Sequence, residues 1–405
     1  MFLQLGQTPT LVVSSFDVAK DIYRTHDVAF SNKPQTTAVK MIMYGCMDVA
    51  FAPYSEEWRQ KRKICVLELL SMKRVRSFQP IREEEVALML DGIREACAGK
   101  SSCVNLTEML IETSNNIMSR CVLGRKYDTS DGRISFEFKA TFSALDAFFD
   151  QLVAERKRMK MEINGQSDDD KDFVDILLQI QEGGKHDFQL TQNDVKAILM
   201  DIFAGGSDTT STLLEWVFAA LLRNPDTMKK VQEEVRRVVG HKSKVDENDL
   251  SKMNYLSCVV KETLRLYPPA PLLIPRETLS DVKVKGFDIP SKTRVFVNAW
   301  AIQRDPEIWD RPEEFLPERF EKQPEVDFRG NDFQLIPFGS GRRGCIGISF
   351  AMASTEYMLA NLLYWFDWKL TGSAASMQDV DMSEIWGLTV IKKVPLHLQP
   401  TLYKP

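Results

Sequence analysis

One uninterrupted helical segment limits the possible folds of this chain more than any other feature. Apolar residues at helical spacing begin after Thr191, where Thr191-Gln192-Asn193-Asp194 fits a capping box, and continue to Arg223, before Asn224-Pro225 ends the helix. At 1.5 Å per residue such a helix would be roughly 50 Å long, enough to cross a whole domain. The other elements must therefore pack around it.

The middle of this helix has a sequence that forms helix poorly, Gly205-Gly206-Ser207-Asp208-Thr209-Thr210. Each glycine costs about 1 kcal/mol relative to alanine in a helix interior. Two explanations stay open. The glycines either let a neighbouring helix pack closely, or they make room for a flat ligand and let the backbone distort beside Thr209.

The rest of the chain indicates a mainly α fold with a small β lobe. Apolar spacing is mostly helical from about Phe16 to Ala220, whereas strand patterns occur within residues 1–13 and again at Val282–Phe287 and Thr293–Val297. A length of 405 residues would allow two or three domains. Because Asn164–Asp170 is typical of a polar loop between helices, we expect a single domain over residues 1–405.

Composition excludes several classes of function. A net charge of -5 argues against nucleic acid as a partner, since phosphate binding needs clustered Lys and Arg. The seven cysteines contain no C-x-x-C pair and the four histidines are scattered, so neither a disulfide framework nor a structural zinc site is indicated. No window approaches eighteen uncharged apolar residues, so we expect no transmembrane segment in this chain.

The strongest chemical signal is a glycine-rich loop around one cysteine, Phe338-Gly339-Ser340-Gly341-Arg342-Arg343-Gly344-Cys345-Ile346-Gly347, followed by a helical segment from about Ile348 to Phe366. The glycines let the backbone wrap around the sulfur, and a helix N-terminus favours a thiolate. Arg343 stands two residues away and could pair with an anionic group of a ligand. An isolated cysteine is usually a small buried apolar residue, but this context favours a ligand.

The pattern F-x-x-G-x-R-x-C-x-G closely resembles the haem-binding loop of the cytochrome P450 monooxygenases. Further motifs occur in that family's order: Trp58-x-x-x-Arg62, Gly205–Thr210, Glu262-Thr263-Leu264-Arg265 and Pro317-Glu318-Arg319-Phe320. Residues 295–302 and 335–338 resemble the plant microsomal family 71. The resemblance implies the cytochrome P450 fold, with haem b (iron protoporphyrin IX) between the long central helix and the helix that follows Cys345.

The resemblance also implies a role for each matching residue. Cys345 would be the axial ligand of the haem iron. Thr209 and Asp208 would supply protons for oxygen activation. Ile346 replaces the proline that relatives usually have, and we expect its backbone N–H to tune the site. The cofactor-binding set would be Cys345, Arg343, Phe338, Gly339, Arg276, Trp58, Arg62 and Gly205, and a structural network supporting the haem loop would join Glu262, Arg265 and Arg319.

By the same resemblance the chain would insert one oxygen atom from O2 into a hydrophobic plant secondary metabolite, such as a terpenoid or a phenolic or indolic compound. Electrons would come from NADPH through NADPH–cytochrome P450 reductase, which would dock on Arg59, Lys61 and Lys63. The location would be the cytosolic face of the endoplasmic reticulum, at the membrane surface. The substrate pocket would be lined by Phe203, Ala204, Leu272, Leu273, Ile274 and Leu388.

Three alternatives are weighed against this function. The cysteine loop also matches G-x-G-x-x-G of an NADP-dependent dehydrogenase, although Pro337 interrupts the segment before it. Some haem-thiolate relatives rearrange peroxides, but these generally lack the Asp208-Thr209 pair. Compared with the family pattern, we expect this chain to lack the N-terminal anchor and, near residues 137–139, to replace part of the pocket roof with one amphipathic segment, about Ser135 to Met161. The third alternative is therefore a truncated, splice-type product that binds haem but is catalytically impaired.

Overall fold

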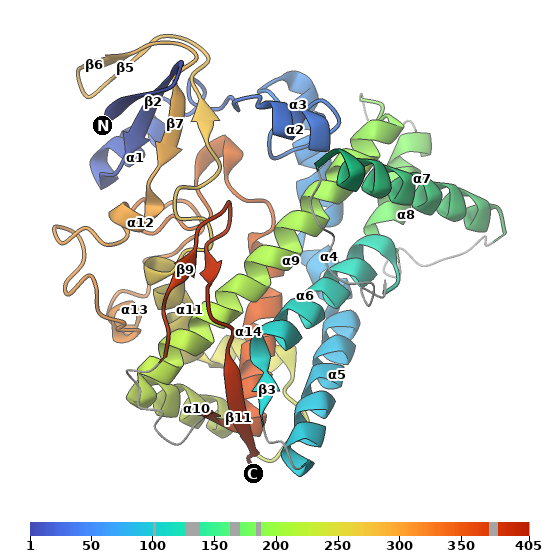
Figure 1. Ribbon diagram of the computed structural model, residues 1–405, viewed down its shortest axis with the longest axis vertical. Coiled ribbons are helices and arrows are strands. Elements are labelled where there is room, and N and C mark those ends of the chain that lie inside the picture. Colours follow the sequence, from blue (N-terminus) through green and yellow to red (C-terminus); the bar gives the residue numbers. More distant parts are fainter. Residues whose placement is uncertain (100–102, 127–137, 163–170, 184–187, 372–379, 405) are drawn as a thin grey trace.

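The computed structural model describes residues 1–99, 103–126, 138–162, 171–183, 188–371 and 380–404, which are mainly helical (Figure 1). The helices are α1 (Phe16–Arg24), α2 (Thr37–Ile42), α3 (Glu56–Ile64), α4 (Met72–Ser77), α5 (Gln79–Ala98), α6 (Leu106–Leu123), α7 (Phe138–Glu162), α8 (Phe173–Gly183), α9 (Gln192–Arg223), α10 (Pro225–Val239), α11 (Asn254–Leu266), α12 (Ala299–Ile302), α13 (Glu318–Lys322) and α14 (Ile348–Trp365).

The strands are short and form small sheets. They are β1 (Phe2–Leu5), β2 (Thr8–Val13), β3 (Val104–Asn105), β4 (Arg276–Glu277), β5 (Val282–Val284), β6 (Phe287–Ile289), β7 (Arg294–Val297), β8 (Phe366–Leu370), β9 (Glu384–Ile385), β10 (Ile391–Lys392) and β11 (His397–Leu402). One sheet has the order β1-β2-β7-β4 and another β3-β11-β8, while β5-β6 and β9-β10 form two-stranded sheets. In the first sheet, β2 pairs in parallel with β7, with Thr10 opposite Arg294 and Val13 opposite Val297.

Two apolar cores correspond to the two parts of the predicted fold. The larger core lies among the helices, and α9 crosses it diagonally in Figure 1 with α6, α11 and α14 packed around it. The smaller core lies between α1 and the β1-β2-β7-β4 sheet and includes Ile22, Phe30 and Val295. The prediction of a mainly α fold with a small β lobe is therefore confirmed.

The central helix begins and ends as its sequence predicts. Thr191 Oγ1 accepts the backbone N–H of Asp194 at 3.2 Å, and Asp194 Oδ2 accepts that of Thr191 at 2.8 Å, which completes the capping box. With 32 residues the helix is about 48 Å long. This end of α9 is also tied to α3, because Lys61 Nζ lies 2.5 Å from Asp194 Oδ1.

The Lys61 pairing corrects one expectation. Lys61 is only 2% exposed and also lies 2.6 Å from Glu57 Oε1 and 2.9 Å from the carbonyl oxygen of Met47. A buried, neutralised ammonium group cannot present charge to a reductase, so Lys61 is a structural residue. Arg59 and Lys63, in contrast, are exposed.

Glu262 is a buried carboxylate at the centre of a network that joins three helices. Its oxygens accept hydrogen bonds from Arg265 at 2.8 and 2.9 Å, from Arg319 Nε at 3.0 Å and from the backbone N–H of Leu316 at 2.8 Å. Arg265 in turn donates to the carbonyl oxygen of Gln303 at 2.8 Å. Because all these donors converge on one buried charge, the network holds α11, α12 and α13 together.

Gln303 extends the Glu262 network toward the cysteine loop. Its amide nitrogen donates to the carbonyl oxygens of Leu264 and Arg265, and its Oε1 accepts the backbone N–H of Ile336 at 2.9 Å. Ile336 precedes Phe338 by two residues. The loop is therefore anchored on the interior of the helical core.

Some expectations fall outside the described residues, among them the polar loop at 164–170 and the start of the shortened segment near residue 137. The predicted amphipathic segment corresponds to α7, which begins at Phe138. Within the described ranges, no helix combines the length and apolar character that crossing a bilayer requires.

Replacing the buried carboxylate should destabilise the fold strongly. In Glu262→Gln the charge of Arg265 stays buried without compensation, so we expect a loss of about 3–5 kcal/mol in the free energy of unfolding. Urea unfolding followed by circular dichroism measures this loss. Glu321→Gln is the control, because it breaks an exposed ion pair with Lys230 and should cost less than about 1 kcal/mol. Equal losses in both variants would contradict the role of the network.

Candidate active site

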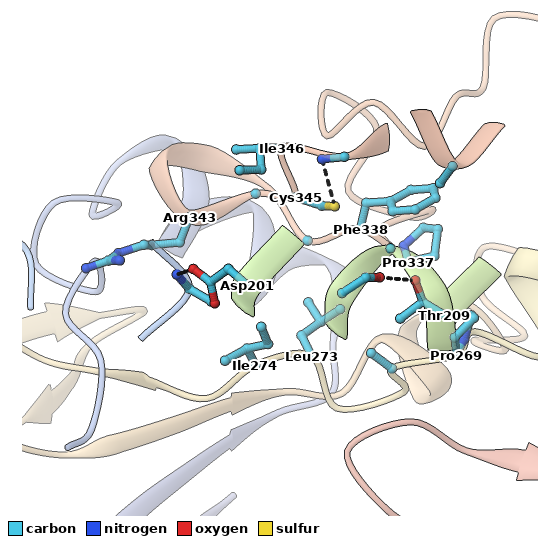
Figure 2. Close-up of a pocket in the computed structure, with 18 of the residues that line it drawn as sticks. Asp201, Thr209, Pro269, Leu273, Ile274, Pro337, Phe338, Arg343, Cys345 and Ile346 are labelled. Carbon is cyan, nitrogen blue, oxygen red and sulfur yellow. Dashed lines mark hydrogen bonds between the residues drawn. The ribbon is translucent and has the colours of Figure 1, made fainter. Parts of the chain in front are cut away.

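A cavity of about 290 Å³ lies between α9, the loop before α14 and the segment from Pro269 to Arg276. In Figure 2, Cys345 and Phe338 lie on one side of it and Leu273 and Ile274 on the other, with Thr209 contributed by α9. Most of the wall is apolar. The long helix and the cysteine loop, which the sequence singled out separately, therefore border one space.

The loop presents the sulfur of Cys345 to this cavity. The backbone N–H of Cys345 donates to the carbonyl oxygen of Phe338 at 2.9 Å, and Sγ accepts the N–H of Gly347 at 3.3 Å (Figure 2). Cys345 lies deep in the protein and is accessible through the cavity that it lines. The N–H that reaches the sulfur thus comes from Gly347, while Ile346 contributes its side chain to the wall.

Opposing effects act on the pKa of the Cys345 thiol. Burial raises the pKa of the thiol, and this effect outweighs the Gly347 N–H and the charge of Arg62, which lower it. The N-terminus of α14 therefore does not produce a thiolate by itself. A bound metal cation would, because a thiol that coordinates a metal loses its proton.

Glycine is required at one position of the loop. Gly341 has φ +66°, and a Cβ atom there would come within 2.3 Å of Asp27 Oδ1. Asp27 uses this space to accept the backbone N–H of Arg342 at 3.0 Å and to pair with Arg276 at 3.1 Å. The loop thus closes on a carboxylate from the far end of the sequence.

Three arginines predicted to bind the cofactor line the cavity: Arg62, Arg276 and Arg343. Arg62 donates to the carbonyl oxygen of Gly344 at 2.8 Å, and Arg343 donates to those of Ser31 and Ala52. Burial, followed by repulsion from Arg276 and Arg62, lowers the pKa of Arg343 to about 9. Cations so placed are stabilised by an anionic ligand group.

Trp58 contacts two of these arginines, Arg62 and Arg343, from outside the cavity wall. It is buried, its Nε1–H donates to the carbonyl oxygen of Val49 at 2.9 Å, and it lies outside the cavity wall. The guanidinium carbons of Arg343 and Arg62 lie 3.8 and 5.7 Å from the centre of its ring. The structure thus places the indole where it orients the two guanidinium groups.

The two glycines of α9 have different reasons to be glycine. A Cβ on Gly206 would lie 2.5 Å from Cε of Met118, a buried residue of α6, so Gly206 permits close helix packing. Gly205 and Gly206 both line the cavity, as does Met118, but a Cβ on Gly205 would meet nothing within 4 Å and would enter the open space. Both explanations considered for the pair therefore hold, one for each residue.

Thr209 and Asp208 occupy different positions relative to the cavity. Thr209 lines it, and its Oγ1 donates to the carbonyl oxygen of Gly205 at 2.6 Å (Figure 2). Asp208 is exposed and lies outside the wall. The hydroxyl is thus at the site, and the carboxylate is next to it in sequence on the solvent side.

Only part of the predicted substrate set lines this cavity. Leu273 and Ile274 do, beside Phe338 and Gly339 of the predicted cofactor-binding set. Leu272 and Leu388 are 39% and 63% exposed, Ala204 is exposed, and Phe203 packs against the helical core. An apolar residue looks the same in the sequence whether it faces a ligand, the core or solvent, so these four residues could not be separated from Leu273 and Ile274 by sequence alone.

Sequence reasoning missed three charged residues at or beside the cavity: Lys33, Asp48 and Asp201. Lys33 and Asp201 line it, and Asp201 Oδ2 accepts the N–H groups of Val49 and Ala50 at 2.6 and 3.0 Å. Burial, followed by repulsion from Asp48, raises the pKa of Asp201 well above its ordinary value. A carboxylate in an otherwise apolar stretch of a buried helix was the signal available for Asp201.

Comparison with known proteins assigns the chain to a class. The family model for cytochrome P450 matches residues 1–155 and 132–395. The chain is 51% identical to phenylacetaldehyde oxime monooxygenase of Prunus mume, covering 100% of this chain and 83% of that protein, and 41% identical to strychnine-11-hydroxylase of Strychnos nux-vomica, covering 98% and 84%. A zebra fish cytochrome P450 structure with abiraterone superimposes with a TM-score of 0.85 at 26% identity, over 100% and 95% of the two chains.

The chain belongs to the cytochrome P450 family and is a monooxygenase. Within that family it belongs to plant family 71, as does cytochrome P450 71A1 of Persea americana, which is 46% identical over 98% of this chain and 86% of that protein. The dehydrogenase alternative is wrong, because turns and irregular backbone precede Gly339, where a dinucleotide fold needs a strand.

The residues around the cavity fit the haem that the family implies. The free thiol of Cys345 faces the space, Gly205 leaves room on the opposite wall, and Arg62, Arg276 and Arg343 offer cationic donors for two carboxylates.

The difference between the two glycines can be tested by adding one methyl group at each. Gly206→Ala should lose about 1 kcal/mol of stability, because overpacking against Met118 exceeds the gain in helix propensity. In a Met118→Ala background the same change should be neutral or stabilising. Gly205→Ala should leave stability unchanged or raised while lowering haem content. Urea unfolding and haem content measure these effects, and a destabilised Gly205→Ala with a stable Gly206→Ala would contradict the assignment.

Proposed function

We propose that this chain is a haem-thiolate monooxygenase in which Cys345 ligates the iron of haem b and a small hydrophobic plant metabolite is oxidised with electrons from NADPH. The observation that carries the proposal is the cavity itself, which joins an accessible thiol, a hydroxyl on a long helix and a group of arginines. A thiolate-ligated haem supplies the activation of O2 and the transfer of one oxygen atom to the substrate.

Several residues in and next to the cavity wall would hold the cofactor. Arg62, Arg276 and Arg343 would bind the propionates, since they line the cavity and the hydrogen bonds of Arg62 and Arg343 to described residues go to neutral carbonyl oxygens. Trp58 would keep Arg343 in place through the contact with its ring. Phe338 and Gly339 would contact the face that carries the thiolate.

Thr209 and Asp208 would supply protons to the site. The hydrogen bond from Thr209 to Gly205 fixes the hydroxyl at the cavity wall. Asp208 is exposed, so it can exchange protons with solvent and pass them toward Thr209. The carboxylate and the hydroxyl together favour oxygen activation over the peroxide-rearranging alternative.

The substrate proposal rests on the wall and on the relatives. Leu273, Ile274 and Leu213 make an apolar surface that excludes water and binds a hydrophobic molecule. Among the alternatives, a phenolic or other aromatic metabolite is favoured over a terpenoid, because a relative 51% identical is named for phenylacetaldehyde oxime.

The electron donor would be NADPH–cytochrome P450 reductase at the cytosolic face of the endoplasmic reticulum, as the family implies. Of the three predicted docking residues, Arg59 and Lys63 remain candidates, because both are exposed. Arg59 follows Trp58 directly, and Lys63 lies near the end of α3. Exposed cations of this kind raise the association rate with an acidic partner.

Absorbance after reduction and exposure to carbon monoxide tests the central proposal. The wild-type protein should give the red-shifted Soret band of a thiolate-ligated haem, and Cys345→Ser should lose it. Cys258→Ser is a matched control, since Cys258 is buried outside the cavity and should keep the band. A histidine-type band in the wild type would overturn the proposal. A normal band without turnover of any aromatic substrate in the presence of reductase would favour the impaired product instead.

The proton-supply role of Thr209 predicts a separation of electron use from product formation. Thr209→Ala should lower product formation by about tenfold or more, while NADPH consumption continues and hydrogen peroxide is released. Thr209→Ser restores the hydroxyl and should recover most of the product. Product and peroxide are measured in the same assay, and an unchanged ratio in Thr209→Ala would show that another group supplies the proton.

A further inference from the structure

We propose that Lys33 is a further cofactor-binding residue, which holds a haem carboxylate as an ammonium group and makes haem retention depend on pH. The inference rests on the proposed function, since it requires haem in the cavity. No motif of the cysteine loop, of α3 or of α9 contains this residue. It lies between α1 and α2 in the segment that follows Phe30.

The position of Lys33 is fixed by the backbone that precedes β4. The side chain is buried, and Nζ donates to the carbonyl oxygens of Ile274 at 3.0 Å and Pro275 at 3.1 Å. An ammonium group has three N–H donors, so one is left for a ligand. Lys33 lines the same cavity as Arg276, which follows Pro275 directly.

Lys33 is surrounded by more cations than anions. Arg276 from β4 and Arg343 from the cysteine loop lower its pKa in addition to burial, while Asp48 from the segment before α3 acts in the opposite direction. Together these bring the pKa well below its ordinary value. Within the described part of the chain, no carboxylate lies at ion-pair distance from Lys33, and its two partners are neutral carbonyls.

Two haem carboxylates would change this balance. Negative charge beside the amine favours the ammonium form, so the amine takes up one proton from solvent as the cofactor binds and donates its third N–H to a carboxylate. The pKa of Arg343, which burial and its neighbouring cations lower to about 9, would be raised again by the same carboxylates, and the Lys33 variants separate its contribution from that of Lys33. Above the pKa that Lys33 has in the haem-bound protein, the proton is lost and haem is held less tightly. Haem loss should therefore accelerate as pH rises.

The test measures haem transfer from the purified haem-containing protein to excess apomyoglobin, followed by Soret absorbance between about pH 6 and pH 10. The wild type should show a rise in transfer rate with pH. Lys33→Met should lose haem about tenfold faster at neutral pH, without that rise. Lys33→Arg should retain haem at every pH, also without it. Lys392→Met is the matched control, because Lys392 is buried outside the cavity and should keep the wild-type profile.

Two results would overturn the inference. One is a Lys33→Met protein with the wild-type rate and profile. The other is a Lys33→Arg protein that keeps the rise, because the titrating group would then be another, such as Arg343, Asp48 or Asp201. If Lys33→Met is isolated without haem, Lys33→Arg alone decides. The Soret band after reduction and exposure to carbon monoxide is recorded for each protein in parallel. Its absence from the wild type counts against the haem-thiolate function, whereas its presence with an unchanged profile counts against Lys33 alone.

Discussion

A cavity in the middle of an apolar core has to be kept open against the tendency of its walls to collapse. Apolar surface gains free energy when it is removed from water, so an unsupported space of about 290 Å³ between packed helices would tend to close. Buried charges support these walls. Glu262 fixes α11, the Lys61–Asp194 pair fixes the start of α9, and Asp27 fixes Arg276 and the cysteine loop. Each is costly to bury and costlier to leave unpaired, so each joins its segments rigidly.

The same buried charges also give the cavity its electrical character. Asp27 and Glu262 have their oxygens engaged by arginines and backbone N–H groups, whereas Arg62, Arg343 and Lys33 reach the wall with neutral partners. The space therefore carries an excess of positive charge next to an uncharged thiol. A dianionic cofactor with a central metal cation would complement both features, because Arg62, Arg276 and Arg343 would hold its carboxylates and Cys345 would hold its metal.

Features that depend on neighbouring residues could be predicted from the sequence. The capping box at Thr191, the pairing of Glu262 with Arg265 three residues later, and the wrapping of the loop around Cys345 all follow from local spacing. Features that depend on distant partners could not. A basic residue at position 61 is typical of a solvated surface, and only the fold shows that Asp194, 133 positions later, neutralises it.

Two further residues, Lys33 and Gln303, could not be predicted for the same physical reason. Lys33 faces carbonyl groups some 240 positions away, and Gln303 is tied to Ile336 by a single side-chain oxygen. Neither belongs to a periodic pattern or a motif, so nothing in the local sequence distinguishes them from surface polar residues. The different structural roles of Gly205 and Gly206 likewise depend on Met118, which lies on another helix.

The parallel pairing of β2 with β7 has a consequence for the synthesis of this protein. Residues 10–13 leave the ribosome early, yet their partners at 294–297 follow only after most of the chain has been made, and Asp27 meets the cysteine loop later still. Contacts so distant in sequence close slowly, because the intervening chain must first be ordered. The pocket wall is therefore among the last parts to assemble, and the cofactor can be captured only by a chain that is nearly complete.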